Sequence, residues 1–174
     1  MRELARKIGY TATALYYHFP DKASLLRELC ETDFRALHGA FKRLGRIGDP
    51  VERIRKTGQA YVHFGLENPQ HYRLIFLTPH AKPTPETSIE RGNPDQDAYA
   101  FLLQAVQEAI RAGRFRPELR DADLVAQTLW AGMHGIVALH LNKSEDDWLD
   151  WRPPLKTSEL LGDTLIRGLL HLPP

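Results

Sequence analysis

Apolar residues recur every three to four positions along most of the chain, in segments separated by short polar stretches that contain proline or glycine. This spacing is typical of amphipathic α-helices, whereas a strand requires alternating apolar and polar residues, of which we find no sustained run. We therefore predict an all-α protein. The predicted helices span residues 2–8, 11–18, 21–44, 50–66, 69–77, 94–112, 121–141 and 158–171.

Several predicted helix boundaries carry recognisable capping residues. Asp-Pro or Asn-Pro pairs stand at 49–50, 68–69 and 93–94. In each pair the first side chain can accept hydrogen bonds from the first helical amides, and proline fits the first helical position. Gly113 is expected to end the helix before it. Residues 78–92 are rich in proline and polar residues, and they predict a flexible surface loop.

The first two predicted helices have the residue types of a helix-turn-helix. Ala5 is small where the second helix would approach, Gly9 suits the turn, and Thr11 suits the N-cap of the second helix. In a helix-turn-helix the second helix enters the major groove of DNA. The apolar residues expected between the two helices are Leu4, Ile8, Leu15 and Phe19.

Polar and aromatic residues would then occupy the outer face of the second helix. Hydroxyl and imidazole groups can bond phosphate oxygens and base edges, and a methyl group can meet a thymine methyl. A helix pair inside a larger core is the alternative explanation. The residues expected on this outer face are Ala12, Thr13, Tyr16, Tyr17 and His18.

The charge distribution favours the same end of the chain as a DNA contact. Residues 1–48 contain nine Lys/Arg and five Asp/Glu, a net charge of +4, while the remainder has fourteen Lys/Arg and seventeen Asp/Glu, a net charge of −3. A basic end on an acidic body favours contact with a polyanion, although a solvated basic helix face gives the same count.

The stretch Leu15-Tyr-Tyr-His-Phe-Pro-Asp-Lys-Ala-Ser-Leu-Leu26 closely resembles the end of the DNA-binding domain in the tetracycline-repressor-like (TetR) family. The resemblance extends from Arg2 to about Leu29. It implies an all-helical, dimeric transcriptional regulator, in most members a repressor that a small ligand releases from DNA. By position, it implies that Thr11, Ala12 and Thr13 open the recognition helix. It further implies that Tyr16, Tyr17 and His18 contact phosphates and bases, and that Lys22 binds the DNA backbone.

Members of this family carry a further helix before this motif, and Met1 stands where their second helix begins. We therefore expect an uncovered apolar patch that includes Leu4, Ile8 and Leu25. Three explanations stay open: the true start lies upstream, this is a trimmed form, or another chain covers the patch.

Composition excludes several classes of protein. With 43% hydrophobic and 26% charged residues among 174, the chain is neither disordered nor collagen-like. The single cysteine, Cys30, excludes an internal disulfide and a thiolate zinc site and suits a reducing cytosol. No apolar run approaches the roughly 20 residues that cross a bilayer, and the N-terminal residues do not open a secretory signal. We expect a cytoplasmic protein with no membrane partner.

The larger C-terminal part carries no catalytic constellation. It has no nucleophile elbow, no phosphate-binding glycine loop and no paired-histidine metal motif. His134 and His140 lie six positions apart on one predicted helix, so they do not share a face and are not expected to chelate a metal. We expect neither enzyme activity nor a metal or cofactor.

The fourth predicted helix contains two glycines, Gly58 and Gly65, on its apolar face. Each costs about 1 kcal/mol of helix stability relative to alanine. They therefore permit either close helix packing or space for a ligand. Aromatic residues around this face predict a mostly apolar effector pocket, unless they form ordinary core. The predicted pocket residues are Tyr61, Phe64, Tyr72, Phe76, Tyr99, Leu102, Trp130 and His134.

The last two predicted helices each carry an apolar stripe that one small domain would struggle to bury. Two such helices from each of two chains would form a four-helix bundle. The residues expected in this dimer interface are Leu129, Gly132, Gly135, Ile136, Leu139, Leu161, Leu165, Gly168 and Leu169. Residues 129–139 also resemble the Trp-His-Gly (WHG) signature of one subclass of TetR-family C-terminal domains. Trp130 and His134 lie one turn apart and either pack together or reach the pocket.

These patterns divide the chain at residue 46. Residues 1–46 are predicted to form the helix-turn-helix with the start of a connecting helix, and residues 47–174 an effector-binding and dimerisation domain. The predicted protein is a homodimeric regulator that binds a palindromic DNA operator as a repressor and is released by a small, largely apolar effector. The alternative is a dimeric small-molecule-binding module that does not bind DNA in this form.

Overall fold

The computed structural model describes residues 1–78 and 88–171, and within these ranges the regular structure is helical apart from one isolated bridge between Phe115 and Leu170. The prediction of an all-α protein is confirmed. A 3₁₀ turn, Arg43–Arg46, follows the third helix, and a π-helical turn, Arg73–Leu77, follows the fifth. The helices are α1 (Arg2–Lys7), α2 (Ala12–His18), α3 (Lys22–Lys42), α4 (Pro50–Glu67), α5 (Pro69–Tyr72), α6 (Ala98–Arg111), α7 (Ala122–Lys143) and α8 (Pro154–Leu169).

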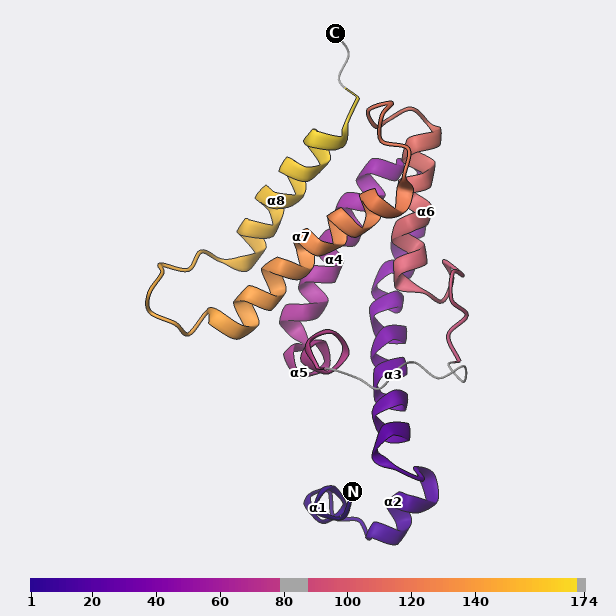
Figure 1. The fold of residues 1–174 in the computed structure, drawn as a ribbon, viewed down its shortest axis with the longest axis vertical. Helices are drawn as coiled ribbons and strands as arrows, with labels where there is room; N and C mark the ends of the chain where they lie inside the picture. The colour runs from indigo at the N-terminus through magenta and orange to yellow at the C-terminus, as the bar shows by residue number, and fades with distance from the viewer. Residues whose placement is uncertain (79–87, 172–174) are drawn as a thin grey trace.

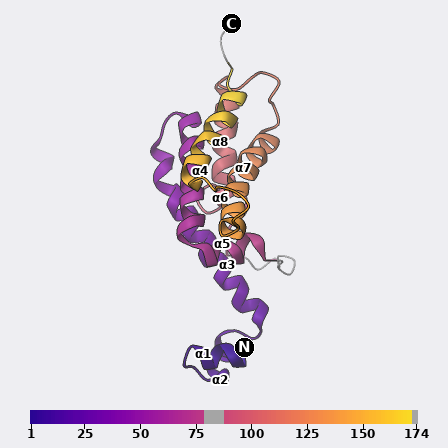
Figure 2. The ribbon, with the colours of Figure 1, turned by 90° about the vertical axis from the view of Figure 1, so that its left-hand side faces the viewer.

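Helix α3 joins a small N-terminal unit to a helical bundle. Figures 1 and 2 show α1 and α2 at one end of the molecule, well apart from α4–α8, with α3 running between the two parts. The helix starts with a reciprocal capping box, in which the Asp21 carboxylate accepts from the Ser24 amide at 2.7 Å and the Ser24 hydroxyl accepts from the Asp21 amide. Its C-terminal half buries Leu37 and Phe41 in the bundle.

Helix α4 occupies the centre of the bundle, where it contacts α3, α6, α7 and α8. Its start is capped as predicted, because the Asp49 carboxylate accepts from the Val51 amide at 3.0 Å and Pro50 takes the first helical position. Near its end Gly65 allows a close helix contact. A Cβ added there would lie 2.6 Å from Cγ1 of Val137 on α7. Close packing is therefore the role of Gly65.

Two apolar clusters hold the bundle together. The first joins α3, α4, α5, the π-helical turn, α6 and α7, and the second joins α4, α6, α7 and α8 with Phe115. The first cluster has at its centre Tyr61, Val62, Tyr72 and Val137. The second has at its centre Ala105, Val106, Ala109, Ala126 and Ile166.

Two predicted helix starts are wrong. Helix α6 begins at Ala98 rather than at Pro94, because Asp97 caps it by accepting from the amides of Tyr99 and Ala100. Residues 93–97 form a separate turn, in which the Asp97 amide donates to the Asn93 carbonyl at 2.8 Å. Helix α8 begins at Pro154 rather than at 158, since proline suits its first position. Of the predicted loop at 78–92, residues 79–87 lie outside the described residues.

Helix α7 is, within the described part of the chain, the one helix long and apolar enough to cross a membrane by length and composition. In this structure it packs against α4, α6 and α8 and buries Val125, Ala126 and Val137. The core helix of a globular domain has the same composition, so this finding assigns no membrane span.

The contact at Gly65 gives a stability prediction. The variant Gly65→Ala is expected to lower the free energy of unfolding by about 1–3 kcal/mol, because overpacking against Val137 and Tyr72 outweighs the better helix propensity of alanine. Gly39→Ala is the control, since Gly39 is exposed on α3 with open space around it, and it should raise the same free energy by up to about 1 kcal/mol. Urea unfolding followed by circular dichroism at one protein concentration measures both. Equal effects in the two variants would contradict the close-packing role.

Candidate nucleic-acid interface and ligand cavity

Helices α1 and α2 pack through small and apolar residues around a glycine turn. Ala5 is 1% exposed and Leu15 is buried, while Phe19 is half-buried. Gly9 has φ +75°, a left-handed conformation that side chains rarely adopt, and the next amide, of Tyr10, returns to the Ala5 carbonyl at 2.9 Å. This is the arrangement predicted for a helix-turn-helix.

Leu4 and Ile8 do not fill the space between the two helices, so that prediction is wrong for them. They are 38% and 51% exposed, so neither side chain is enclosed between the helices. Leu25 is half-buried. The exposed apolar patch expected around these residues is present.

The outer face of α2 carries the predicted DNA-contacting side chains. Tyr17 is 87% exposed and Tyr16 is 47% exposed, while Thr13, His18 and Lys22 are also exposed. The Tyr17 and His18 rings meet edge to face with centroids 5.2 Å apart, which restrains both rings on the surface.

The first two residues of the predicted DNA-binding set, Thr11 and Ala12, lie at the N-terminus of α2. The Thr11 hydroxyl accepts from the Ala14 amide at 3.1 Å and caps α2, while Ala12 is half-buried. A capped N-terminus presents its positive dipole end to an approaching phosphate. Thr11 and Ala12 therefore lie where the helix would meet the DNA backbone.

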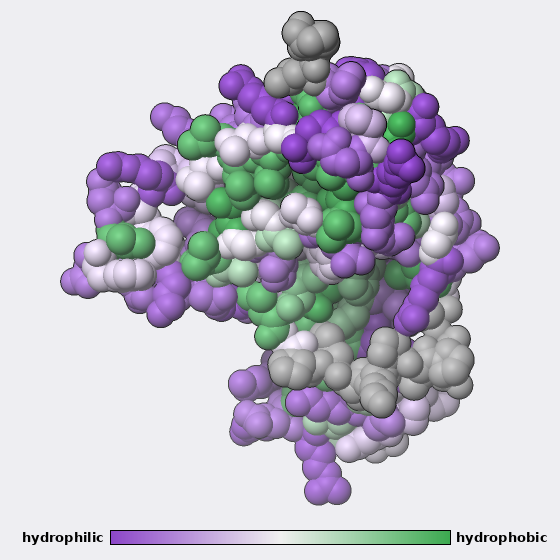
Figure 3. All heavy atoms as spheres, turned by 45° about the horizontal axis from the view of Figure 1, so that its top comes forward, coloured by the Kyte–Doolittle hydropathy of each residue, from purple (hydrophilic) through white to green (hydrophobic). Residues whose placement is uncertain are grey.

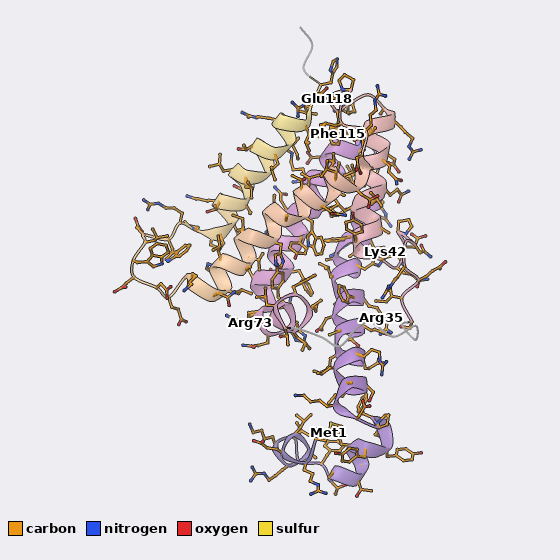
Figure 4. The ribbon with its side chains drawn as sticks, in the orientation of Figure 1. Met1, Arg35, Lys42, Arg73, Phe115 and Glu118 are labelled. Carbon is orange, nitrogen blue, oxygen red and sulfur yellow. The ribbon has the colours of Figure 1, made fainter. Side chains whose placement is uncertain are left out.

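Exposed cationic side chains surround this face. Arg2, Arg6 and Lys7 lie on α1 and Lys22 starts α3; in addition, Lys7 pairs with Glu3 at 3.7 Å. Figure 4 places Met1 at this end of the molecule, far from Phe115 and Glu118, with Arg35 and Lys42 along α3 between them. These exposed cations of the N-terminal unit and the start of α3 suit contact with phosphates.

The middle of α3 is tied to the bundle by polar and aromatic contacts. Asp33 is buried, and its Oδ1 lies 2.7 Å from Nδ1 of His71 on α5. The rings of Phe34 and Phe76 meet edge to face at 5.9 Å. Movement of α5 or of the π-helical turn therefore acts directly on the helix that carries the N-terminal unit.

The bundle encloses a cavity of about 350 Å³ beside this part of α3. Its volume falls within the range of small-molecule sites, and its wall is mainly apolar and aromatic. Helices α3, α4, α6, α7 and α8 and the π-helical turn all contribute to the wall. Five of the predicted pocket residues line it: Tyr61, Phe76, Tyr99, Leu102 and Trp130.

Three predicted pocket residues do not line the cavity. Tyr72 and His134 lie behind Tyr61, and Phe64 packs into the first apolar cluster instead. The wall also contains residues that sequence analysis missed, because nothing local marks them: Phe34, Leu37, Phe41, Arg55, Asp97, Met133 and Gly162. Gly58 lines the cavity, and a Cβ added there would lie 3.5 Å from Cγ of Met133, at ordinary contact distance, so this glycine is not required for close helix packing.

A buried hydrogen-bond network stands behind the cavity wall. The hydroxyls of Tyr61 and Tyr72 lie 2.9 Å apart, and they lie 3.1 and 2.7 Å from Nδ1 of His134. Burial raises the pKa of Tyr61 to about 12 and raises the pKa of Tyr72 further, while burial lowers the pKa of His134. All three groups are therefore neutral near pH 7. Trp130 and His134 pack together at 6.3 Å, with Trp130 also in the cavity wall.

The predicted dimer residues differ in how far the protomer itself buries them. Leu129 is buried in the second apolar cluster and lines the cavity, so its placement in an interface is wrong. Gly132 is used inside the protomer, because an added Cβ would lie 3.0 Å from Leu165. The protomer half-buries five others: Gly135, Ile136, Leu161, Leu165 and Leu169. Of these, Gly135 has open space beside it. Leu139 and Gly168 are exposed.

An exposed apolar face does exist on α7 and α8, and it shares Gly135, Leu139 and Gly168 with the predicted interface. It combines Leu139 with two leucines that sequence analysis missed, Leu124 and Leu160, which are 61% and 70% exposed. We call this set, with Ala131, Gly135 and Gly168, the α7/α8 face. Figure 3 shows hydrophobic residues gathered across this side of the molecule with hydrophilic residues around them.

The lowered pKa of His134 gives a pH prediction. The unfolded histidine takes up a proton below its ordinary pKa of 6.5, whereas the folded one stays neutral to lower pH, so stability falls as pH drops through 6.5. The urea midpoint is expected to fall between pH 7.5 and 5.5, and His134→Asn, which cannot be protonated, should reduce that fall. An unchanged pH dependence in the variant would contradict the neutral buried imidazole.

Comparison with known proteins identifies two matching family models. The model of the family described as "Bacterial regulatory proteins, tetR family" matches residues 1–29. The model described as "Tetracyclin repressor-like, C-terminal domain" matches residues 54–150. The matched stretches lie on either side of the domain boundary predicted at residue 46. Both descriptions are of regulatory proteins, in agreement with the prediction that the chain is not an enzyme.

Curated relatives and solved structures agree with these matches. The HTH-type transcriptional repressor KstR2 of Mycolicibacterium smegmatis is 26% identical over 130 residues, which cover 72% of this chain and 61% of KstR2. The nucleoid occlusion factor SlmA of Vibrio atlanticus is 36% identical over 74 residues, which cover 42% of this chain and 38% of SlmA. The chain thus spans less than two thirds of the length of these relatives.

Among solved structures, a Rhodococcus protein of unknown function aligns with TM-score 0.74 and 28% identity over 98% of this chain and 84% of its own. The TetR-family regulator PfmR of Thermus thermophilus aligns with TM-score 0.74 and 19% identity over 98% of this chain and 88% of its own, which shows the shared fold. On the strength of the matched models, this chain belongs to the TetR family.

Proposed function

We propose that the chain is a DNA-binding transcriptional regulator that acts as a homodimeric repressor and is released from its operator by a small, largely apolar effector. The observation that carries this proposal is the outer face of α2. Tyr16, Tyr17 and His18 turn away from the protein interior beside a cluster of exposed cations. Exposed aromatic side chains with polar tips, on a helix held by a glycine turn, suit the major groove.

Each protomer would read one half-site of a palindromic operator. A two-fold dimer places its two recognition helices about one helical turn of DNA apart, or a multiple of it. Phosphate contacts from Lys22 and the α1 cations would fix the register, and Tyr16, Tyr17 and His18 would supply contacts to bases. The repressor role has support from the name of the relative KstR2. A protein with this role works in the cytoplasm, where the DNA is.

The cavity would hold the effector, and α3 would transmit its binding. Phe34, Leu37 and Phe41 of α3 line the cavity, so a ligand touches the same helix that positions the N-terminal unit. For the ligand to release DNA, it must bind one arrangement of the two recognition helices better than the other. The bound ligand would therefore favour a separation of the recognition helices that does not fit the operator.

The α7/α8 face would form the dimer interface. Each protomer exposes Leu124, Leu139 and Leu160 on two adjacent helices, and an exposed apolar face of this kind is typical of a protein–protein contact site. Small residues between these leucines, such as Ala131 and Gly135, allow helices of a second protomer to approach closely. A second copy would complete a four-helix bundle about a two-fold axis.

A dimeric ligand-binding module without DNA binding is the second candidate. The exposure of Leu4 and Ile8 favours it, since an apolar patch beside the helix-turn-helix weakens the support of α2. Selection from a random duplex pool separates the two candidates. The regulator binds a defined palindrome with salt-dependent affinity, whereas the module enriches no sequence.

The selected operator tests the role of α2 directly. Tyr17→Ala is expected to weaken operator binding by about tenfold or more while the dimer persists, because Tyr17 is 87% exposed and supports nothing inside the protomer. Tyr10→Ala is the matched control, an equally large change at an exposed tyrosine in the turn, and should alter affinity less than about twofold. Fluorescence anisotropy with a labelled duplex measures both, and light scattering reports the dimer. Equal losses in the two variants would refute the assignment of the α2 face.

The dimer interface has its own test. Leu160→Glu is expected to convert the dimer to a monomer at micromolar concentration, because a carboxylate buried between two apolar faces lacks a partner. Leu29→Glu, at an exposed leucine of α3, should leave the dimer intact. Analytical ultracentrifugation measures the dissociation constant of each variant. A Leu160→Glu protein that stays dimeric would place the interface elsewhere.

A further inference from the structure

The cavity wall is a nearly continuous aromatic surface. Phe76 of the π-helical turn meets Phe34 at 5.9 Å, Tyr61 at 5.7 Å and Trp130 at 6.1 Å between ring centroids. Trp130 in turn meets Tyr99 at 6.0 Å. These five rings come from α3, α4, the π-helical turn, α6 and α7, and all of them line the cavity. The faces of aromatic rings carry negative potential, so such a wall attracts cations.

The charged groups at the wall add to this negative potential. Among the described residues that line the cavity, Arg55 is the one with a cationic side chain. Its guanidinium is already paired with the carboxylates of Asp163 and Glu52. Asp97 lines the same cavity; its Oδ1 accepts from the amides of Tyr99 and Ala100 and its Oδ2 from the amide of Gly92, and among the ion pairs of the described residues none involves it. Its position at the start of α6 offsets part of its charge, but Asp123, bonded to the Tyr99 hydroxyl at 2.9 Å, adds a second carboxylate nearby.

The hydroxyl groups of the cavity wall already form hydrogen bonds with other groups of the protein. Thr57 donates to the Arg53 carbonyl at 2.8 Å, and Tyr99 donates to Asp123. Tyr61 belongs to the network with Tyr72 and His134. An anionic ligand needs several donated hydrogen bonds or an unpaired cation to replace its water. Arg55 already shares its charge with Asp163 and Glu52, so an anionic ligand would compete with these two carboxylates for it.

We infer that this cavity selects a lipophilic organic cation: a substituted ammonium with an aromatic or aliphatic body. The inference rests on the proposed function, in which the cavity is the effector site. The ammonium lies against the rings of Tyr99 and Trp130 and near the carboxylate of Asp97, and the apolar body fills the space between Phe34, Phe76 and Met133. A substituted ammonium is weakly hydrated, so it enters this wall at a lower desolvation cost than a carboxylate of the same size.

Three probes that share a phenyl group and a short alkyl chain test the selection. They are (4-phenylbutyl)trimethylammonium, 5-phenylpentan-1-ol and 5-phenylpentanoate, and isothermal titration calorimetry with the full chain measures their affinities. The ammonium is expected to bind at least about tenfold more tightly than the alcohol, and the carboxylate most weakly. If the carboxylate binds most tightly, the cation selection is overturned while the cavity remains an effector site. If none of the probes binds at millimolar concentration, the inference is overturned, whereas operator selection decides the regulator function independently.

The variant Asp97→Asn isolates the charge. Asparagine caps a helix as well as aspartate does, so α6 keeps its start while the cavity loses one carboxylate charge. The affinity for the ammonium probe should fall by about five- to tenfold, and that for the alcohol should change less than about twofold. Asp21→Asn, the same substitution at the N-cap of α3 outside the cavity, should change neither. Equal losses for the ammonium and the alcohol in Asp97→Asn would mean that Asp97 acts only on the shape of the wall, and this would overturn the inference.

Discussion

The structure depends on one helix, α3, which extends from the N-terminal unit into the bundle. At its start the reciprocal hydrogen bonds of Asp21 and Ser24 cap the helix, and near its middle the contact between Asp33 and His71 fixes it to α5. Its C-terminal half then forms part of the cavity wall through Leu37 and Phe41. Because a rigid helix transmits displacement along its length, a change of shape at the cavity would reach the helix-turn-helix through α3 in the proposed mechanism.

The aromatic wall keeps its shape because a polar layer supports it from behind. Tyr61 forms part of the wall, and its hydroxyl is held by Tyr72 and His134, whose rings stack at 5.7 Å. Each of the three groups is neutral, so the layer is satisfied without a buried charge that would need compensation. A wall supported in this way stays open as a cavity rather than collapsing into the apolar clusters on either side.

Local sequence was sufficient for the existence of the helices and most of their starts and for the α2 face, but not for the starts of α6 and α8, the cavity or the exposed side of α7. Thr11, Asp21 and Asp49 mark helix starts within three residues of themselves, and the spacing of Ala5, Gly9 and Leu15 determines a packed pair that long-range contacts do not override. The cavity depends instead on residues brought together from distant parts of the chain, such as Arg55, Asp97 and Gly162. Helix α7 is apolar on several sides, so its periodicity does not reveal which side faces out, and Leu129 was assigned to the wrong one.

That division of α7 into several apolar sides has a mechanical consequence. The inner side contributes Trp130 and Met133 to the cavity and, nearer the start of the helix, buries Val125 and Ala126 in the core, while the outer side exposes Leu124 and Leu139 on the α7/α8 face. A rigid helix cannot shift on one side without shifting on the others. If a ligand pushes Trp130, the same displacement reaches the leucines that a second protomer would cover, so the two protomers would turn relative to each other while each α3 moves. Ligand binding would then change the spacing of the recognition helices by two additive routes, one along α3 and one across the dimer.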